Sequence, residues 1–153
     1  MSRLPTPPST PMIASSAPHV LHIEDSEGDI EFLRFAFEES RTEVRFTIIR
    51  DGANALRHVD AMAAGTLPLP DLILLDIKLP KVNGHAILHH LRAHPSLAQL
   101  PVVILSGSHN RSDRDRSLAL GATAHLVKPM GISESLALIR HLQTFLPHPQ
   151  PPG

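Results

Sequence analysis

Five short apolar runs alternate with five amphipathic stretches along the middle of the chain. Apolar residues recur at helical spacing in the stretches, which end near Ser40, Ala64, Ala93, Leu120 and Phe145. Alternation of strands and helices predicts a parallel sheet with helices on both faces. The five predicted strands are His19–Ile23, Arg45–Ile49, Leu72–Asp76, Pro101–Ser106 and Ala124–Val127.

Two of these runs, Leu72–Leu75 and Val102–Leu105, are continuously apolar, as is typical of parallel strands covered on both faces. Right-handed crossovers leave few topologies for such a chain. We predict a flavodoxin-like (βα)5 fold, an α/β fold with a doubly wound, five-stranded parallel sheet in strand order 2-1-3-4-5. Ligands of such sheets bind beyond the carboxyl ends of the strands, at the switch point between strands 1 and 3.

The two ends of the chain lack this periodicity. Residues 1–18 are rich in Pro, Ser and Thr, and residues 147–153 contain four prolines. We predict disordered tails on either side of one domain at residues 19–146, with no DNA-binding domain after Phe145. No apolar run approaches the roughly 18 residues of a membrane span, so a membrane location is not expected.

Composition narrows the function classes. The 153 residues carry a net charge of −1, which leaves no basic footprint for direct nucleic-acid binding. The absence of cysteine excludes disulfides and thiol chemistry, and it fits a cytoplasmic protein. The eleven histidines make solubility dependent on pH.

Polar residues stand at the ends of four predicted strands: Glu24 and Asp25, Asp76, Ser106, and Lys128. Three carboxylates at neighbouring strand ends repel one another, at about 4 kcal/mol per pair for a 4 Å separation and an effective dielectric near 20. Oxygen ligands favour Mg²⁺ over zinc as the compensating cation. A dication, a lysine, a hydroxyl and an attacking carboxylate together are typical of phosphoryl transfer through an aspartyl phosphate.

On these motifs the chain resembles the response regulator receiver domains of two-component signalling, over about residues 19–146. The matching stretches are 22–26, 71–84, 101–107 and 121–129. The resemblance implies that Asp76 is the phosphoacceptor, that Ser106 is the switch hydroxyl, and that Lys128 pairs with the acceptor or its phosphoryl group. It also implies a cis peptide before Pro129 and a set of Mg²⁺ ligands. Those ligands are Glu24, Asp25, Asp76 and the backbone carbonyl of Lys78.

Several positions of this chain bear on how the switch and the phosphate lifetime of the family would operate here. His125 stands where the family has its switch aromatic, and Lys78 and Ser108 stand at positions that tune the lifetime of the phosphate. Asp29 and the 97–101 spacing are similar to regulators paired with phytochrome-type sensor kinases, although this is a weaker resemblance than that to the family.

The function expected from the resemblance is that of a single-domain response regulator in a phosphorelay. It takes a phosphoryl group from a sensor histidine kinase, catalyses only its own phosphorylation and dephosphorylation, and signals to an unidentified downstream protein by contact. The alternative left open is a receiver-like interaction module that works without phosphorylation, suggested by the polar His125. A flavodoxin is disfavoured because the chain has no Trp or Tyr, and an aspartate-nucleophile phosphatase because Asp25 precedes Ser26-Glu27.

Two further features of the sequence bear on self-association and on metal binding. A homodimer through the last helices and strands is left open, with an apolar seam formed by Leu126, Leu136, Ile139 and Leu142. The second feature is a group of histidines with two i,i+4 pairs, a spacing that can bind zinc. The pairs are rotated by about 100° around the helix and no acidic third ligand is apparent nearby, so a solvated helix face is predicted. These histidines are His85, His89, His90 and His94.

Overall fold

The computed structural model describes residues 17–147 and contains one parallel five-stranded sheet in the order β2-β1-β3-β4-β5. The predicted strand order and fold class are therefore confirmed. The predicted tails at 1–18 and 147–153 lie almost wholly outside the described residues. The elements are β1 (His19–Ile23), α2 (Glu27–Glu39), β2 (Arg45–Ile49), α3 (Gly52–Ala63), β3 (Leu72–Asp76), α4 (Gly84–Arg92), the 3-10 helix η1 (Pro95–Leu97), β4 (Val102–Ser106), α5 (Arg111–Ala119), β5 (Ala124–Val127) and α6 (Ile132–Gln143).

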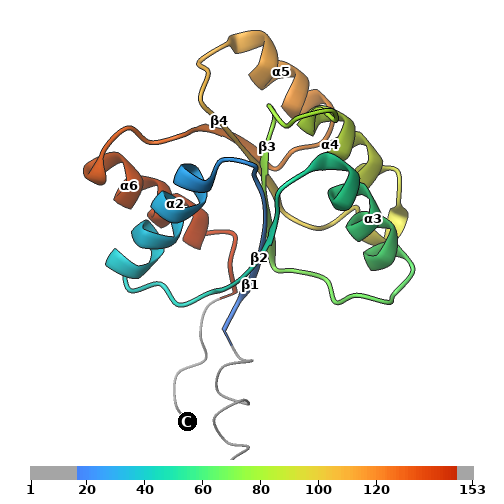
Figure 1. Cartoon of the computed structure of the whole chain (residues 1–153), viewed down its shortest axis with the longest axis horizontal. Helices are drawn as coiled ribbons and strands as arrows, with labels where there is room; N and C mark the ends of the chain where they lie inside the picture. Colours follow the sequence, from blue (N-terminus) through green and yellow to red (C-terminus); the bar gives the residue numbers. More distant parts are fainter. Residues whose placement is uncertain (1–16, 148–153) are drawn as a thin grey trace, which may run out of the picture.

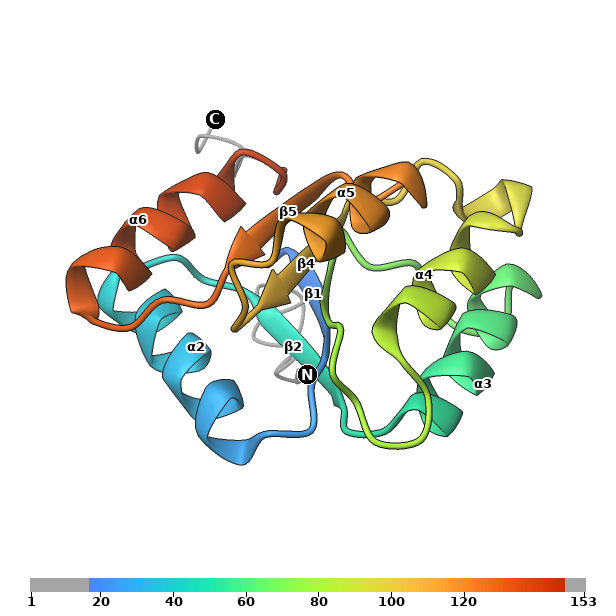
Figure 2. The same ribbon diagram turned by 90° about the horizontal axis from the view of Figure 1, so that it is seen from above.

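The helices form two layers around the sheet. Helices α2 and α6 cover one face, while α3, α4 and α5 lie on the other (Figures 1 and 2). Each layer closes over its own apolar cluster: Phe37 and Leu142 belong to the α2–α6 side, and Val59 and Leu91 to the α3–α4 side. Strands β3 and β4 are buried along their whole length, as their continuous apolar sequence predicts.

Strand register brings the polar strand ends to one level. Ile23 pairs with Leu75, so the next residue, Glu24, comes level with Asp76. In the same way Ser106 of β4 pairs with Val127 of β5, which places Lys128 directly beyond it. The carboxyl ends of β1, β3, β4 and β5 thus meet at one edge of the sheet.

Polar side chains cap the helices that leave this edge. Ser26, Asp51, Asn83 and Asn110 are the N-caps of α2, α3, α4 and α5, and each accepts a hydrogen bond from a backbone N–H of the first turn. Ser26 Oγ accepts from Asp29 N at 3.2 Å. The cap fixes the first turn of α2 beside the end of β1.

The expected apolar dimer seam is wrong for two of its four residues. Ile139 and Leu142 are both 0% exposed, because they pack into the core cluster between α6 and the sheet. Helical spacing alone does not separate a core-facing row from a surface seam, and here the row faces inward. Only Leu126 and Leu136 of the expected set are partly exposed.

Two other expectations also fail. His85 is only 3% exposed, so the four-histidine segment is not a uniformly solvated face: this side chain packs inward against α5. All peptide bonds of the described residues are trans, including the one before Pro129. Trans is the isomer that X–Pro bonds favour by about 0.5–1 kcal/mol.

Within residues 17–147 no helix is both long and apolar enough to cross a membrane.

Gly84 begins α4 in direct contact with the chain that follows Asp76. A Cβ at this position would lie 2.2 Å from the carbonyl oxygen of Asp76 and 2.7 Å from Cα of Ile77. Gly84 N also donates to Ile77 O at 2.7 Å. Only glycine allows α4 to start this close to the end of β3.

We predict that Gly84→Ala lowers the free energy of unfolding by about 1–3 kcal/mol, because the added methyl forces the backbone apart. Urea unfolding measures the change. Gly28→Ala, in the first turn of α2, is the matched control, since its Cβ would come no closer than 3.9 Å to Ser26 Oγ. The control should be neutral or stabilising; equal losses in both variants would contradict the steric explanation.

Candidate functional site

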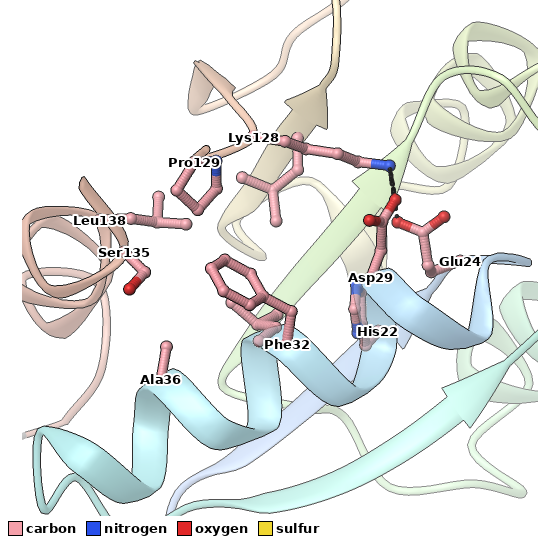
Figure 3. A pocket seen from close by; sticks show the side chains of 11 residues that line it. His22, Glu24, Asp29, Phe32, Ala36, Lys128, Pro129, Ser135 and Leu138 are labelled. Carbon is pink, nitrogen blue, oxygen red and sulfur yellow. Dashed lines mark hydrogen bonds and ion pairs between the residues drawn. The ribbon is translucent and has the colours of Figure 1, made fainter. Parts of the chain in front are cut away.

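The ammonium group of Lys128 lies among three carboxylates at the edge of the sheet. Its Nζ is 2.7 Å from Asp29 Oδ2, 2.9 Å from Glu24 Oε1 and 3.5 Å from Asp76 Oδ2. Figure 3 shows the Lys128 side chain reaching from the end of β5 to Asp29 and Glu24. One lysine thereby joins the ends of β1, β3 and β5 to the first turn of α2.

Burial makes the charge on Glu24 costly. Its residue is 1% exposed, and removal from water raises the pKa of Glu24 to about 7, a shift that the bond from Lys128 opposes and the charge of Asp76 reinforces. Burial alone lowers the pKa of Lys128, but the bonds to Asp29 and Glu24 outweigh it and the pKa is raised. Lys128 is therefore charged at neutral pH, and it stabilises the charge on Glu24 that burial opposes.

Glu24, Asp25 and Asp76 form the acidic trio that the sequence predicts. Each offers one carboxylate oxygen, and the three atoms lie within 4.8 Å of one another. Asp25 is exposed, whereas Asp76 is only 6% exposed. Lys78, also exposed, donates its backbone N–H to Asp76 Oδ1 at 3.2 Å. An all-oxygen cluster with an exposed side is chemically suited to a hard divalent cation such as Mg²⁺.

Ser106 lies at the end of β4, next to Lys128 in the sheet. Its residue is 1% exposed, and its Oγ accepts from Ser108 N at 3.1 Å. Its carbonyl oxygen accepts from Lys128 N at 2.7 Å. Ser108 is half-buried in the loop before α5 and accepts from Asn110 N at 3.0 Å. A backbone hydrogen bond thus connects Ser106 directly to Lys128.

His125 faces inward and is 4% exposed. Its Nδ1 is 2.9 Å from Ser117 Oγ, and His85 Nε2 is 2.8 Å from the same oxygen. The hydroxyl of Ser117 donates its own hydrogen to Asp113 O, so both imidazoles act as donors to Ser117 Oγ. Burial, then the charge of Arg114, lowers the pKa of His125, so it is neutral at pH 7. His125 Nε2 is buried without a hydrogen-bond partner among the described residues.

Comparison with known proteins gives the family. Residues 20–140 match the response regulator receiver domain family. The chain belongs to this family. The response regulator Rcp1 of Synechocystis sp. is 30% identical over 127 residues, which cover 82% of this chain and 86% of Rcp1.

Two solved structures of similar regulators share the fold over most of the chain. The Mn²⁺-bound form of Rcp1 has a TM-score of 0.73 at 29% identity and covers 86% of this chain and 99% of its own. A phosphorylated cyanobacterial phytochrome response regulator, RcpA, has a TM-score of 0.75 at 28% identity, with the same two coverages of 86% and 99%. This receiver therefore resembles regulators solved in a metal-bound and in a phosphorylated state.

Two residues of this receiver site were missed in the sequence analysis. Asp29 entered it only as a mark of a subgroup, yet its carboxylate makes the shortest ion pair to Lys128. Its place in the first turn of α2, three residues after the cap, was the available signal. His22 carried no signal, because within β1 it stands in an apolar run.

His22 lies under the ion pairs, in a pocket between α2, α6 and the sheet (Figure 3). It is 2% exposed, and its Nδ1 is buried with no partner among the described residues. Burial, reinforced by the charge of Lys128, lowers the pKa of His22 from 6.5 to about 4. The folded protein therefore holds this imidazole neutral directly below a charged lysine.

This burial predicts a pH dependence of stability. The folded pKa of His22 lies below its unfolded value, so the contribution is present above pH 6.5 and is lost as the pH falls toward 4. Wild type should lose about 3 kcal/mol more than His22→Leu across this window. Urea unfolding at a series of pH values tests this, with the exposed His89→Ala as control. Parallel pH profiles for wild type and His22→Leu would refute the assignment.

Proposed function

We propose that this receiver accepts a phosphoryl group on Asp76 from a sensor histidine kinase in a Mg²⁺-dependent reaction. The observation that carries the proposal is the position of Asp76 at the end of β3. There its carboxylate is 3.5 Å from the Lys128 ammonium, and one of its oxygens lies within 4.8 Å of a carboxylate oxygen of Glu24 and of Asp25, close enough to share a metal ion. A nucleophilic carboxylate beside a fixed cation suits attack on a phosphoryl group, whose charge must be neutralised in the transition state.

The acidic trio supports the magnesium part of the proposal. Four carboxylates, those of the trio and Asp29, face a single lysine, so the site holds excess negative charge. Burial, reinforced by the charge of Asp76, raises the pKa of Glu24, and a bound cation would offset this cost. Glu24, Asp25, Asp76 and the backbone carbonyl of Lys78 would hold Mg²⁺. The bound ion would supply positive charge against the phosphoryl oxygens.

The side chains of the receiver would carry out the transfer itself. An oxygen of Asp76 attacks phosphorus, the P–N bond of the kinase phosphohistidine breaks, and its electron pair returns to the imidazole. Exposed Asp25 and Lys78 flank Asp76, so we place the approach of the donor over them. Lys128 then pairs with the new phosphoryl oxygens, and the hydroxyl of Ser106 donates to one of them.

The comparisons support a narrower proposal about the pathway. Similarity to Rcp1 and to the phytochrome regulator RcpA favours a phytochrome-type kinase as the donor. We further propose that the receiver acts in the cytoplasm and signals by contact with a downstream protein. Its own phosphorylation and dephosphorylation are the reactions we assign to it.

The test is phosphorylation by acetyl phosphate in the presence of Mg²⁺. Intact-protein mass spectrometry should show one added phosphoryl group on wild type and none on Asp76→Asn. Removal of Mg²⁺ by a chelator should also abolish the product. Asp115→Asn, an exposed aspartate on α5, is the control and should be modified as wild type is. No product on wild type would sink the proposal and leave the phosphorylation-independent interaction module.

We also predict that Lys78→Ala shortens the phosphoryl lifetime. The ammonium of Lys78, two residues after the acceptor, would pair with the phosphoryl group and hinder attacking water. An exposed pair of this kind is worth about 0.5–1 kcal/mol, so hydrolysis should accelerate by about two- to fivefold. Phosphate release after removal of acetyl phosphate measures the rate. Lys81→Ala, exposed in the same loop, should leave the rate unchanged; equal rates for all three proteins would reject the role of Lys78.

A further inference from the structure

A second cluster of metal-ligating side chains lies between α3 and α4, which run side by side on one face of the sheet (Figures 1 and 2). It consists of Asp60 in the last turn of α3, His90 in the last turn of α4, and His94 just after α4. His90 Nε2 is 2.7 Å and His94 Nε2 is 3.6 Å from the same oxygen, Asp60 Oδ1. Asp60 is the acidic third ligand that the sequence did not reveal, because it comes from the neighbouring helix.

The surroundings of His94 independently favour a bound cation. Its Nε2 is buried and has no hydrogen-bond partner within residues 17–147. At 3.6 Å the oxygen of Asp60 is too far away to serve as one. An imidazole nitrogen withdrawn from water without a partner costs free energy, which a coordinated cation would recover.

We propose that Asp60, His90 and His94 form a site for a divalent transition-metal ion, with Zn²⁺ as the favoured ion. Their three ligand atoms lie within 4.8 Å of one another. Tetrahedral zinc with bonds of about 2.0–2.2 Å places its ligand atoms about 3.3 Å apart. The two distances to Asp60 Oδ1, 2.7 and 3.6 Å, lie on either side of this value, so small side-chain rotations complete the geometry.

The donor set distinguishes this site from the acidic trio. Two imidazole nitrogens and one carboxylate oxygen suit zinc, whereas the trio offers oxygen alone and suits magnesium. The Asp60 side chain is 62% exposed, which leaves an open side for a water molecule as fourth ligand. At 2.7 Å a hydrogen lies between His90 Nε2 and Asp60 Oδ1, and the metal ion would take its place between the two atoms.

Zinc titration by calorimetry tests the proposal on the full chain, in excess Mg²⁺ to occupy the acidic trio. Wild type should bind one Zn²⁺ and show a higher melting temperature with zinc. His90→Gln, His94→Gln and Asp60→Asn keep similar volume and polarity, and each should weaken binding at least about tenfold. Visible absorption of Co²⁺ in place of Zn²⁺ reports tetrahedral coordination and should disappear in the same variants.

Two control variants separate this site from other zinc binding. His89→Ala removes an exposed histidine of the same helix and should leave the zinc affinity unchanged. Asp25→Asn weakens the acidic trio and should also leave it unchanged. The proposal is overturned if the His90→Gln/His94→Gln double variant binds zinc as tightly as wild type. It is equally overturned if tight binding is lost in Asp25→Asn and retained in the double variant.

Discussion

The contact of one ammonium group with three carboxylates is the interaction on which this receiver site depends. At separations of about 4 Å each carboxylate pair is repulsive by about 4 kcal/mol at an effective dielectric near 20. Lys128 offsets this repulsion, because its ammonium bonds Glu24 and Asp29 and lies near Asp76. These contacts also join the end of β1, the first turn of α2 and the end of β3. An added charge on Asp76 would therefore compete for the ammonium with both other carboxylates. A change in the charge of Asp76 would therefore alter the ion pair between Lys128 and Asp29 at the start of α2.

Most of the fold and half of the site follow from local sequence. Continuous apolar runs identify β3 and β4 because a strand covered on both faces has no polar side to display. Parallel pairing then brings strand ends together, so Glu24, Asp76, Ser106 and Lys128 converge without any knowledge of side-chain conformation. The sequence predicts these residues because backbone topology alone positions them.

The parts that the sequence did not predict depend on contacts between helices or between side chains. Asp29 approaches Lys128, and Asp60 approaches His90, from elements far away in the chain. Periodicity shows that a helix has an apolar side, but it gives neither the rotation of the helix nor its neighbour, so it does not show that Ile139 faces the core. Burial of Ile139 and Leu142 removes two of the four residues of the expected seam.

Two sets of hydrogen bonds connect this end of the sheet with α5 and the loop before it. Ser106 and Ser108 connect the end of β4 to the loop before α5 by a hydrogen bond of 3.1 Å. His125 connects β5 to α5 through Ser117, but its hydrogen bond is buried and its imidazole is neutral. A rotation of His125 would break that bond and leave His85 as the remaining imidazole donor to Ser117. Movement of His125 would therefore cost a buried hydrogen bond, whereas the bond between Ser106 and Ser108 is only partly buried.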